Sequence, residues 1–205
     1  RVNNAGTVAT FSVSAAGTAL TYQWKRNGVN LSDGAGISGA VTADLTVTGV
    51  VQGDAGSYRV AVTGADGTIS SGVATLTVID GPVITGQPAS RVNAAGTTAA
   101  FTVAVSGTVP FAYQWRRNGE PVSDGGIVSG AATAILTLSG VLNAAEGSYS
   151  VQVVNPAGTV VSSDAILTVT DPVINVQPVS RINNAGTLAT FSVSAAGTAL
   201  TYQWK

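Results

Sequence analysis

The carboxylates are the first side chains in this sequence to consider for chemistry, because two of the usual catalytic and metal-binding residue types are missing. The chain has 205 residues, with ten Asp and Glu, and it contains neither Cys nor His. A thiol nucleophile, an imidazole base or a zinc site of the usual kind needs one of these two missing types. The sequence therefore predicts no catalytic residue and no cofactor, and any metal site would have to be built from oxygen ligands.

Most of the acidic residues stand in turns. Asp33 and Asp124 lie in matching SDG sequences, and Asp66 lies in a DG pair, where turn formation alone explains an aspartate. Asp80 and Asp171 lie in the sequences IDGPV and TDPVI. A calcium ion takes roughly six to eight oxygen ligands, and one aspartate per sequence supplies few of them. We expect a turn or linker cap at both places, with calcium as the alternative.

The cationic and aromatic residues give no clear binding site. Arg26, Arg116 and Arg117 follow two of the tryptophans, next to Asn-Gly pairs. We expect them to be edge-strand charges that prevent unwanted pairing, with a small anion or a glycan as the alternative partner. All three tryptophans stand at predicted core positions, which disfavours an aromatic platform for carbohydrate. Phe111 is the one aromatic residue that stays a candidate.

Composition excludes several classes of partner. Charged residues make up 9% of the chain and the net charge is −1, so nothing attracts nucleic acid or an anionic membrane. No apolar run approaches the roughly 18 residues that a membrane span requires. No signal peptide is visible and the first residue is Arg1, so we expect a mature or internal segment. The lack of Cys and Met suits an extracellular or cell-surface protein, and a biased genome explains it equally well.

The chain repeats itself. Residues 1–25 return as residues 181–205 with changes only at Val2/Ile182 and Val8/Leu188, and a more distant copy starts at Arg91. The pattern is therefore A-B-A, with a higher-order unit of two domains. A lead-in of the type PVITGQP precedes the second and third copies. We expect this chain to be a segment of a longer array of such domains, with a complete 205-residue product as the alternative.

Each copy has the pattern of an all-β domain. Short β-branched runs alternate with turn residues about every 8–12 positions, and no window has the apolar period of a helix. Phe11 and Val13 share one strand face, as do Tyr22 and Trp24. Asn27-Gly28 and Asn118-Gly119 are hairpin turn pairs. A further hairpin is expected around Asp66-Gly67.

A family resemblance appears in the core positions. The first copy has a strand residue, a tryptophan eleven positions later, and then the sequence DAGSYRV. This combination resembles the I-set immunoglobulin domains without their core disulfide, as in tandem repeats of bacterial cell-surface or fibre proteins. The second copy has Ala145 in place of the aspartate, which puts any aspartate-dependent turn contact in doubt. The matching residues are Val13, Trp24, Asp54, Gly56, Tyr58 and Val60; Val103, Trp115, Gly147, Tyr149 and Val151; and Val193 and Trp204.

The resemblance implies tandem immunoglobulin-like β-sandwiches of about 90 residues each. The expected domains are 1–79, which lacks the lead-in strand, then 82–170, which is complete, and 172–205, which holds only the first strands of a third domain. Val13 and Val60 take the positions that a disulfide would join. Such a bridge stabilises a domain by about 2–5 kcal/mol, and burial of two valines contributes about 1.5–3 kcal/mol each. The tyrosine before Val60 is expected to donate a hydrogen bond to the backbone just upstream.

The junctions suggest a mechanical role. Asp80, Pro82, Asp171 and Pro172 mark linkers of two or three residues, which restrict the angle between neighbouring domains. The sequence therefore favours a structural segment of a long extracellular repeat protein that forms a semi-rigid stalk, fibre or surface filament. The expected partners are neighbouring immunoglobulin-like domains or other copies of the protein. The alternatives are an adhesin module that binds protein or glycan through its loops, and an accessory domain of an extracellular enzyme.

Overall fold

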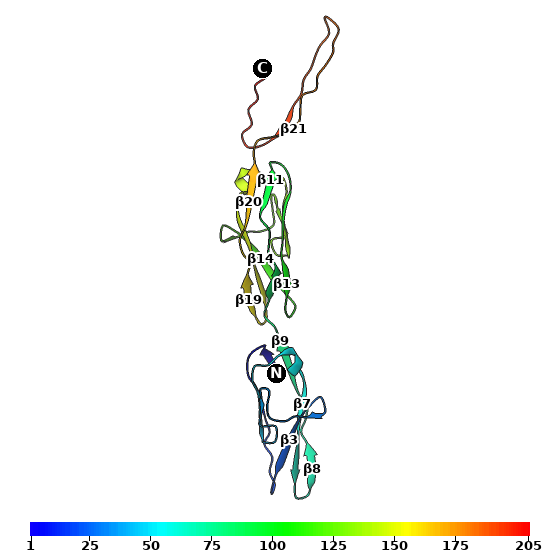
Figure 1. Ribbon diagram of the computed structural model, residues 1–205, viewed down its shortest axis with the longest axis vertical. Helices are drawn as coiled ribbons and strands as arrows, with labels where there is room; N and C mark the ends of the chain where they lie inside the picture. Colours follow the sequence, from blue (N-terminus) through cyan, green and yellow to red (C-terminus); the bar gives the residue numbers. More distant parts are fainter. The chain divides into compact units, whose positions relative to one another are not determined.

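Short strands joined by turns make up nearly all of the structure, a computed structural model that describes residues 1–205 (Figure 1). The only helices are two 3-10 turns, η1 (Gln52–Asp54) and η2 (Asn143–Ala145), and no helix has the length and apolar character needed to cross a membrane. The chain divides into two compact units. The first holds residues 1–81, 107–109 and 155–158, and the second holds the remaining residues up to 205.

The first domain is a sandwich of two sheets. Its larger sheet has the order β1 (Val2–Asn4), β9 (Ala74–Ile79), β7 (Gly56–Gly64), β3 (Thr21–Arg26) and β4 (Val29–Asn30), with β8 (Gly67–Ser70) also on β7. Its smaller sheet has the order β2 (Ala9–Ser12), β6 (Asp44–Val47) and β5 (Ile37–Ser38). All pairs are antiparallel except β1 with β9. The hairpin predicted around Asp66 joins β7 to β8, while β9 pairs with the start of β7.

The second domain repeats this plan. Its larger sheet has the order β11 (Arg91–Ala94), β20 (Ala165–Thr170), β18 (Gly147–Asn155), β14 (Ala112–Arg117) and β15 (Glu120–Pro121), with β19 (Gly158–Val161) on β18. Its smaller sheet has the order β12 (Ala99–Thr102), β17 (Ile135–Leu138) and β16 (Val128–Ser129). It adds one pair that the first domain does not have, between the lead-in strand β10 (Val83–Gly86) and β13 (Ala104–Ser106).

The third copy forms only the lead-in pair. Strand β21 (Val173–Val176) pairs antiparallel with β22 (Ser194–Ala196), with the same register shift as in β10 and β13. Here the core prediction for Val193 and Trp204 differs from the structure, because Val193 is only partly buried and Trp204 is 52% exposed. The physical reason is that residues 172–205 include no equivalent of β7, the strand that covers Trp24 in the first domain.

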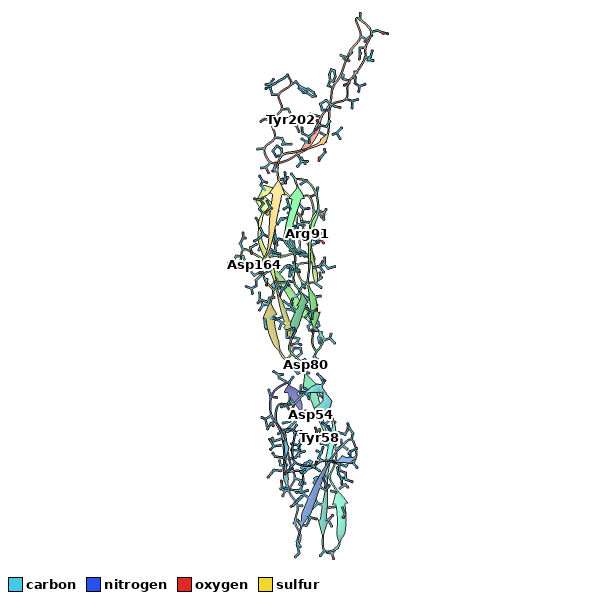
Figure 2. All side chains as sticks on the ribbon, viewed as in Figure 1. Asp54, Tyr58, Asp80, Arg91, Asp164 and Tyr202 are labelled. Carbon is cyan, nitrogen blue, oxygen red and sulfur yellow. The ribbon has the colours of Figure 1, made fainter.

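The period of two along the strands builds both cores. In β7 the alternate residues Tyr58, Val60 and Val62 are buried, and β20 alternates in the same way over its whole length (Tyr58 is labelled in Figure 2). Each core gathers the inward residues of both its sheets. The buried members are Ala9, Phe11, Trp24, Leu45, Val47, Val50, Leu76 and Val78 in the first domain, beside the three from β7, and their counterparts around Trp115 in the second.

Candidate functional site

The tryptophans form the centre of each sandwich. Trp24 is 3% exposed and faces Val60 across the β3–β7 ladder, while Trp115 is 0% exposed and faces Val151. Each indole Nε1 donates a hydrogen bond to a loop carbonyl, Thr42 O at 2.9 Å and Thr133 O at 2.8 Å. A buried indole N–H needs such a partner. Both rings are therefore used by the core and are not available to a ligand.

A pair of stacked rings joins the two sheets of each domain. Phe11 on β2 stacks on Tyr58 on β7, with ring centroids 4.5 Å apart and planes 14° apart. Phe101 and Tyr149 do the same at 4.8 Å and 19°. The period of two along the strand predicts that Phe11 faces the core, but it does not show which ring Phe11 stacks on. The recurrence of phenylalanine two positions before the core valine in every copy is the signal that would have found it.

The valines at the positions that a disulfide would join lie in this core or at its edge. Val60 and Val151 are fully buried, and Val103 is 4% exposed. Val13 is only partly buried and lines a pocket that is open to solvent, together with Trp24 and Val60. Val103 is more deeply buried than Val13 because the lead-in strand β10 pairs with the chain just after Val103. No strand pairs with the chain just after Val13. We keep as a proposal that this packing replaces the covalent bridge.

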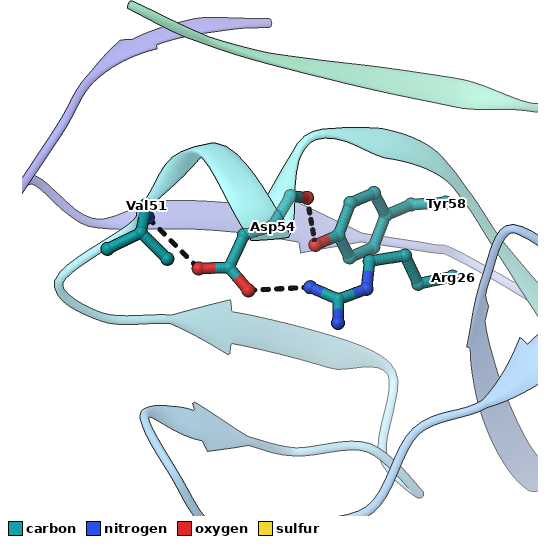
Figure 3. Close-up of polar contacts among 4 residues, drawn as sticks. All are labelled: Arg26, Val51, Asp54 and Tyr58. Atoms are coloured by element: carbon teal, nitrogen blue, oxygen red, sulfur yellow. Dashed lines mark hydrogen bonds and ion pairs between the residues drawn. The ribbon is translucent and has the colours of Figure 1, made fainter. Parts of the chain in front are cut away.

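The predicted tyrosine contact is confirmed in both domains. Tyr58 Oη donates to Asp54 O at 2.7 Å (Figure 3). Tyr149 Oη donates to Ala145 O at 2.7 Å. Burial raises the pKa of both phenols above their ordinary value of 10.0, and the nearby arginines oppose this only in part. The hydroxyl is thus held neutral as a hydrogen-bond donor, which is a structural role.

Arg26 is part of an ion pair and is not the edge-strand charge that the sequence predicts, because β3 lies between β7 and β4. Its Nη1 lies 2.5 Å from Asp54 Oδ1, and Asp54 Oδ2 accepts the N–H of Val51 at 3.0 Å (Figure 3). Burial lowers the pKa of Arg26, but its interactions with Tyr58 and Asp54 outweigh burial and raise the pKa overall. The aspartate of the DAGSY sequence therefore ties η1 to the end of β3.

The second domain makes the same connection without the aspartate. Arg117 donates to the carbonyl oxygens of Ala144 and Glu146, the latter at 2.6 Å. The carboxylate of Glu146 turns to another strand, where Oε1 accepts the N–H of Val169 at 2.7 Å. Backbone carbonyls thus take the place of the missing carboxylate. The second domain therefore keeps this turn contact although Ala145 stands where the first domain has Asp54.

The glycine of the DAGSY sequence, Gly56, is required for a steric reason. Gly56 has φ +150°, and a Cβ built there would lie 2.6 Å from Asn27 Oδ1. That oxygen accepts the N–H of Ser57 at 2.9 Å. Asn27 and Gly28 themselves have φ of 49° and 85°, as the predicted hairpin turn requires. One asparagine therefore closes the β3–β4 turn and holds the start of β7.

The turn aspartates behave as the sequence predicts. Asp33 Oδ1 accepts the N–H of Ala40 at 2.7 Å, and Asp124 Oδ1 accepts that of Ala131 at 2.7 Å. Phe111 is partly buried, with its ring 6.5 Å from Tyr113, so it offers no exposed platform. Arg116 donates to Gln152 Oε1 at 2.7 Å. No three acidic side chains come close enough together to hold a metal ion.

The linker residues make capping contacts. The Asp80 carboxylate accepts Gln52 Nε2 at 2.9 Å, and the Asp80 N–H donates to Thr108 Oγ1 at 2.8 Å. Figure 2 shows Asp80 at the end of the first domain. Asp171 accepts both the N–H and the hydroxyl of Thr198, at 3.0 and 2.9 Å. Pro82 and Pro172 directly precede β10 and β21.

Comparison with known proteins agrees with this fold. Residues 82–169 match the model of the "Immunoglobulin I-set domain". Roundabout homolog 1 of Mus musculus is 31% identical over 177 residues, which cover 78% of this chain and 11% of that protein. The chain thus spans about a tenth of this relative's length.

Two solved structures show the same fold in tandem. The I-band fragment I67-I69 of titin has a TM-score of 0.70 and 22% identity, over 87% of this chain and 65% of the fragment. The N-terminal eight Ig domains of Down Syndrome Cell Adhesion Molecule give a TM-score of 0.69 and 18% identity, over 82% and 23%. The chain is all-β with tandem immunoglobulin-like domains. Roundabout homolog 1 is an animal protein, so the bacterial source gains no support from it.

Proposed function

We propose that this chain, in which residues 82–169 are an immunoglobulin domain of the I-set family, is a structural segment of a long extracellular repeat protein. In this proposal the chain contributes to a semi-rigid stalk, fibre or surface filament. The observation that carries it is that one module is built twice with the same internal contacts. Every feature that the two copies share has a partner inside its own domain, from the indole N–H to the tyrosine hydroxyl.

The polar residues support this interpretation. Arg26 and Arg117, which sequence alone left open for ligands, are bound by Asp54 and by backbone carbonyls, and the turn carboxylates of Asp33 and Asp124 accept backbone N–H groups. Arg116 binds Gln152 Oε1, and its Nε is the one buried side-chain polar atom without a partner. A catalytic or binding site would instead collect unsatisfied or perturbed groups in a cleft. We therefore propose a non-enzymatic role, and we keep the division into domains 1–79, 82–170 and 172–205 as part of the proposal.

Electron microscopy of the native protein, purified from its source, tests the stalk directly. The proposal predicts elongated particles with a regular bead along their length. Dispersed single beads would contradict it, because immunoglobulin-like domains that are not held in line do not make a stalk.

An adhesin module is the second candidate. The likeness to a solved cell adhesion molecule favours it, although at 18% identity this likeness shows the fold alone. In the adhesin interpretation the loops bind a protein or glycan, so exchange of the loop 32–39 for the loop 123–130 would abolish surface binding. In the stalk interpretation the exchange leaves binding unchanged, because spacer loops need no individual specificity. A bacterial source stays a prediction, which the genomic context of the gene would test.

A further inference from the structure

The second domain has a pocket that is open to solvent and is lined by residues from β14, β16, β17 and η2. Its volume is about 270 Å³, and the one charged side chain in its wall is that of Arg117. Apolar side chains form much of the remaining wall, among them Val122, Val128, Leu138 and Leu142. The pocket therefore combines a cation with an apolar surface, all from within one complete domain.

The equivalent residues of the first domain bind a carboxylate. Arg26 Nη1 and the N–H of Val51 donate to the two oxygens of the Asp54 side chain, at 2.5 and 3.0 Å (Figure 3). Arg117 and Leu142 are the matching residues of the second domain, and both line the pocket. The second domain thus repeats the two donors of this carboxylate contact.

In the second domain these two donors have no carboxylate partner in the chain. Ala145 stands in place of the aspartate, and the carboxylate of Glu146, next in sequence, accepts the N–H of Val169. No hydrogen bond is found for the N–H of Leu142 or for Nη1 of Arg117, whose Nε and Nη2 donate to backbone carbonyls. A cation and an N–H that line one pocket favour an anionic ligand, because charge-assisted hydrogen bonds are the strong ones.

We propose that this pocket binds a small aliphatic carboxylate. The carboxylate of the ligand takes the place that the Asp54 side chain has in the first domain, and it accepts from Arg117 Nη1 and the N–H of Leu142. The alkyl chain lies against Val128 and Leu138, where burial of apolar surface adds to the binding. At roughly 30 Å³ for each water-sized group, the pocket admits about nine non-hydrogen atoms, which suits a chain of about six carbons.

The site goes beyond the proposed function. The stalk is supported by the contacts that the two copies share, whereas this pocket results from a position at which they differ, Asp54 and Ala145. A stalk segment can carry the site without depending on it. Elongated native particles combined with no carboxylate binding would therefore reject the site and leave the stalk intact.

NMR titration of the full chain with hexanoate tests the site. We expect a dissociation constant of about 1 mM or lower, with the largest shifts at the amide of Leu142 and at Nε–H of Arg117. Acetate keeps the carboxylate without the alkyl chain, and hexanol keeps the chain without the charge, so each should bind about tenfold more weakly. No shift of the Leu142 amide up to about 20 mM hexanoate, or equal binding of hexanol, would overturn the proposal.

Three variants separate this pocket from general binding to the protein. Ala145→Asp supplies the carboxylate that the first domain has, so the chain should stay folded and hexanoate binding should fall by about tenfold or more. Arg117→Gln should weaken binding as well, because it removes the cation. Arg116→Gln is the matched control, since Arg116 binds Gln152 and is not part of the pocket wall, and binding should not change. Undiminished binding in folded Ala145→Asp, or an equal loss in Arg116→Gln, would contradict the proposal.

Discussion

At the residue scale, stacked rings and backbone hydrogen bonds join the parts of each core. Tyr149 joins these two devices, since its ring stacks on Phe101 and its hydroxyl binds Ala145 O. Sequence predicted this hydrogen bond because it spans only four residues. It did not predict the stack, because Phe101 and Tyr149 come from strands of different sheets, and nothing local in sequence shows which rings will meet.

Removal of the tyrosine hydroxyl should destabilise the second domain without disturbing its packing. Tyr149→Phe leaves the buried carbonyl of Ala145 without its donor, so the free energy of unfolding should fall by about 1–3 kcal/mol. Tyr202→Phe is the matched control, since Tyr202 is 57% exposed and no hydrogen bond of its hydroxyl is found. Urea denaturation followed by tryptophan fluorescence measures both, and an equal effect of the two variants would refute a specific role for Tyr149.

The same hydroxyls make stability depend on alkaline pH. Burial raises the pKa of Tyr58 and Tyr149 above 10.0 in the folded protein, so the folded state holds these protons more tightly than the unfolded state. Their contribution to stability is complete below pH 10 and is lost as the pH rises through the raised pKa. Denaturation between pH 8 and about pH 11 should show this decline. The double variant Tyr58→Phe/Tyr149→Phe should show a flatter profile, and an unchanged slope would rule out these groups.

The glycine in the DAGSY-type sequence gives a steric prediction. Gly147 has φ +151°, and an added Cβ would lie 2.6 Å from Asn118 Oδ1. Gly147→Ala should therefore cost about 2 kcal/mol or more, through strain and loss of the Asn118 contact. Gly158→Ala is the matched control, because nothing lies within 4 Å of its added Cβ. It should change thermal stability little, and a small effect at both sites would contradict the steric account.

At the element scale, the lead-in strand is the main difference between the copies. Strand β10 pairs with β13, just after Val103, whereas residues 14–16 of the first domain belong to no strand. The repeat pattern in the sequence revealed the missing lead-in, because PVITGQP-like residues recur before two of the three copies. The strand's partner could not be predicted from this pattern, since two other strands, β11 and β12, lie between β10 and β13 in sequence. For the same reason the sequence predicts an edge-strand charge at Arg26 and not an ion pair, because its partner Asp54 lies 28 residues away in sequence.

Loss of the lead-in contact should weaken the second domain. Ile84 is the residue of β10 that packs on the core cluster, and Thr85 beside it is exposed. Ile84→Asp should lower the free energy of unfolding by about 2–3 kcal/mol, through lost burial and the cost of an unpaired charge. Thr85→Asp should change it by less than about 0.5 kcal/mol. Equal effects in a denaturant titration would show that β10 does not support the core.

At the scale of the whole molecule, repetition favours a mechanical role over a chemical one. Two domains reproduce the same internal network even where a residue changes, as when carbonyls replace Asp54 around Arg117. Sequence predicted the modules and their turns well because both depend on neighbouring residues. It could not predict the ion pair or the stacked rings, which depend on how distant strands meet.

Small-angle X-ray scattering of the full chain at low concentration tests the central claim, that its domains are held in line as a stalk segment. Two domains in line, each about 40 Å long, predict a radius of gyration of about 24 Å or more. A compact globule of 205 residues would have about 17 Å. A value near the first figure, unchanged across salt concentrations, supports the stalk. A value near the second would contradict it.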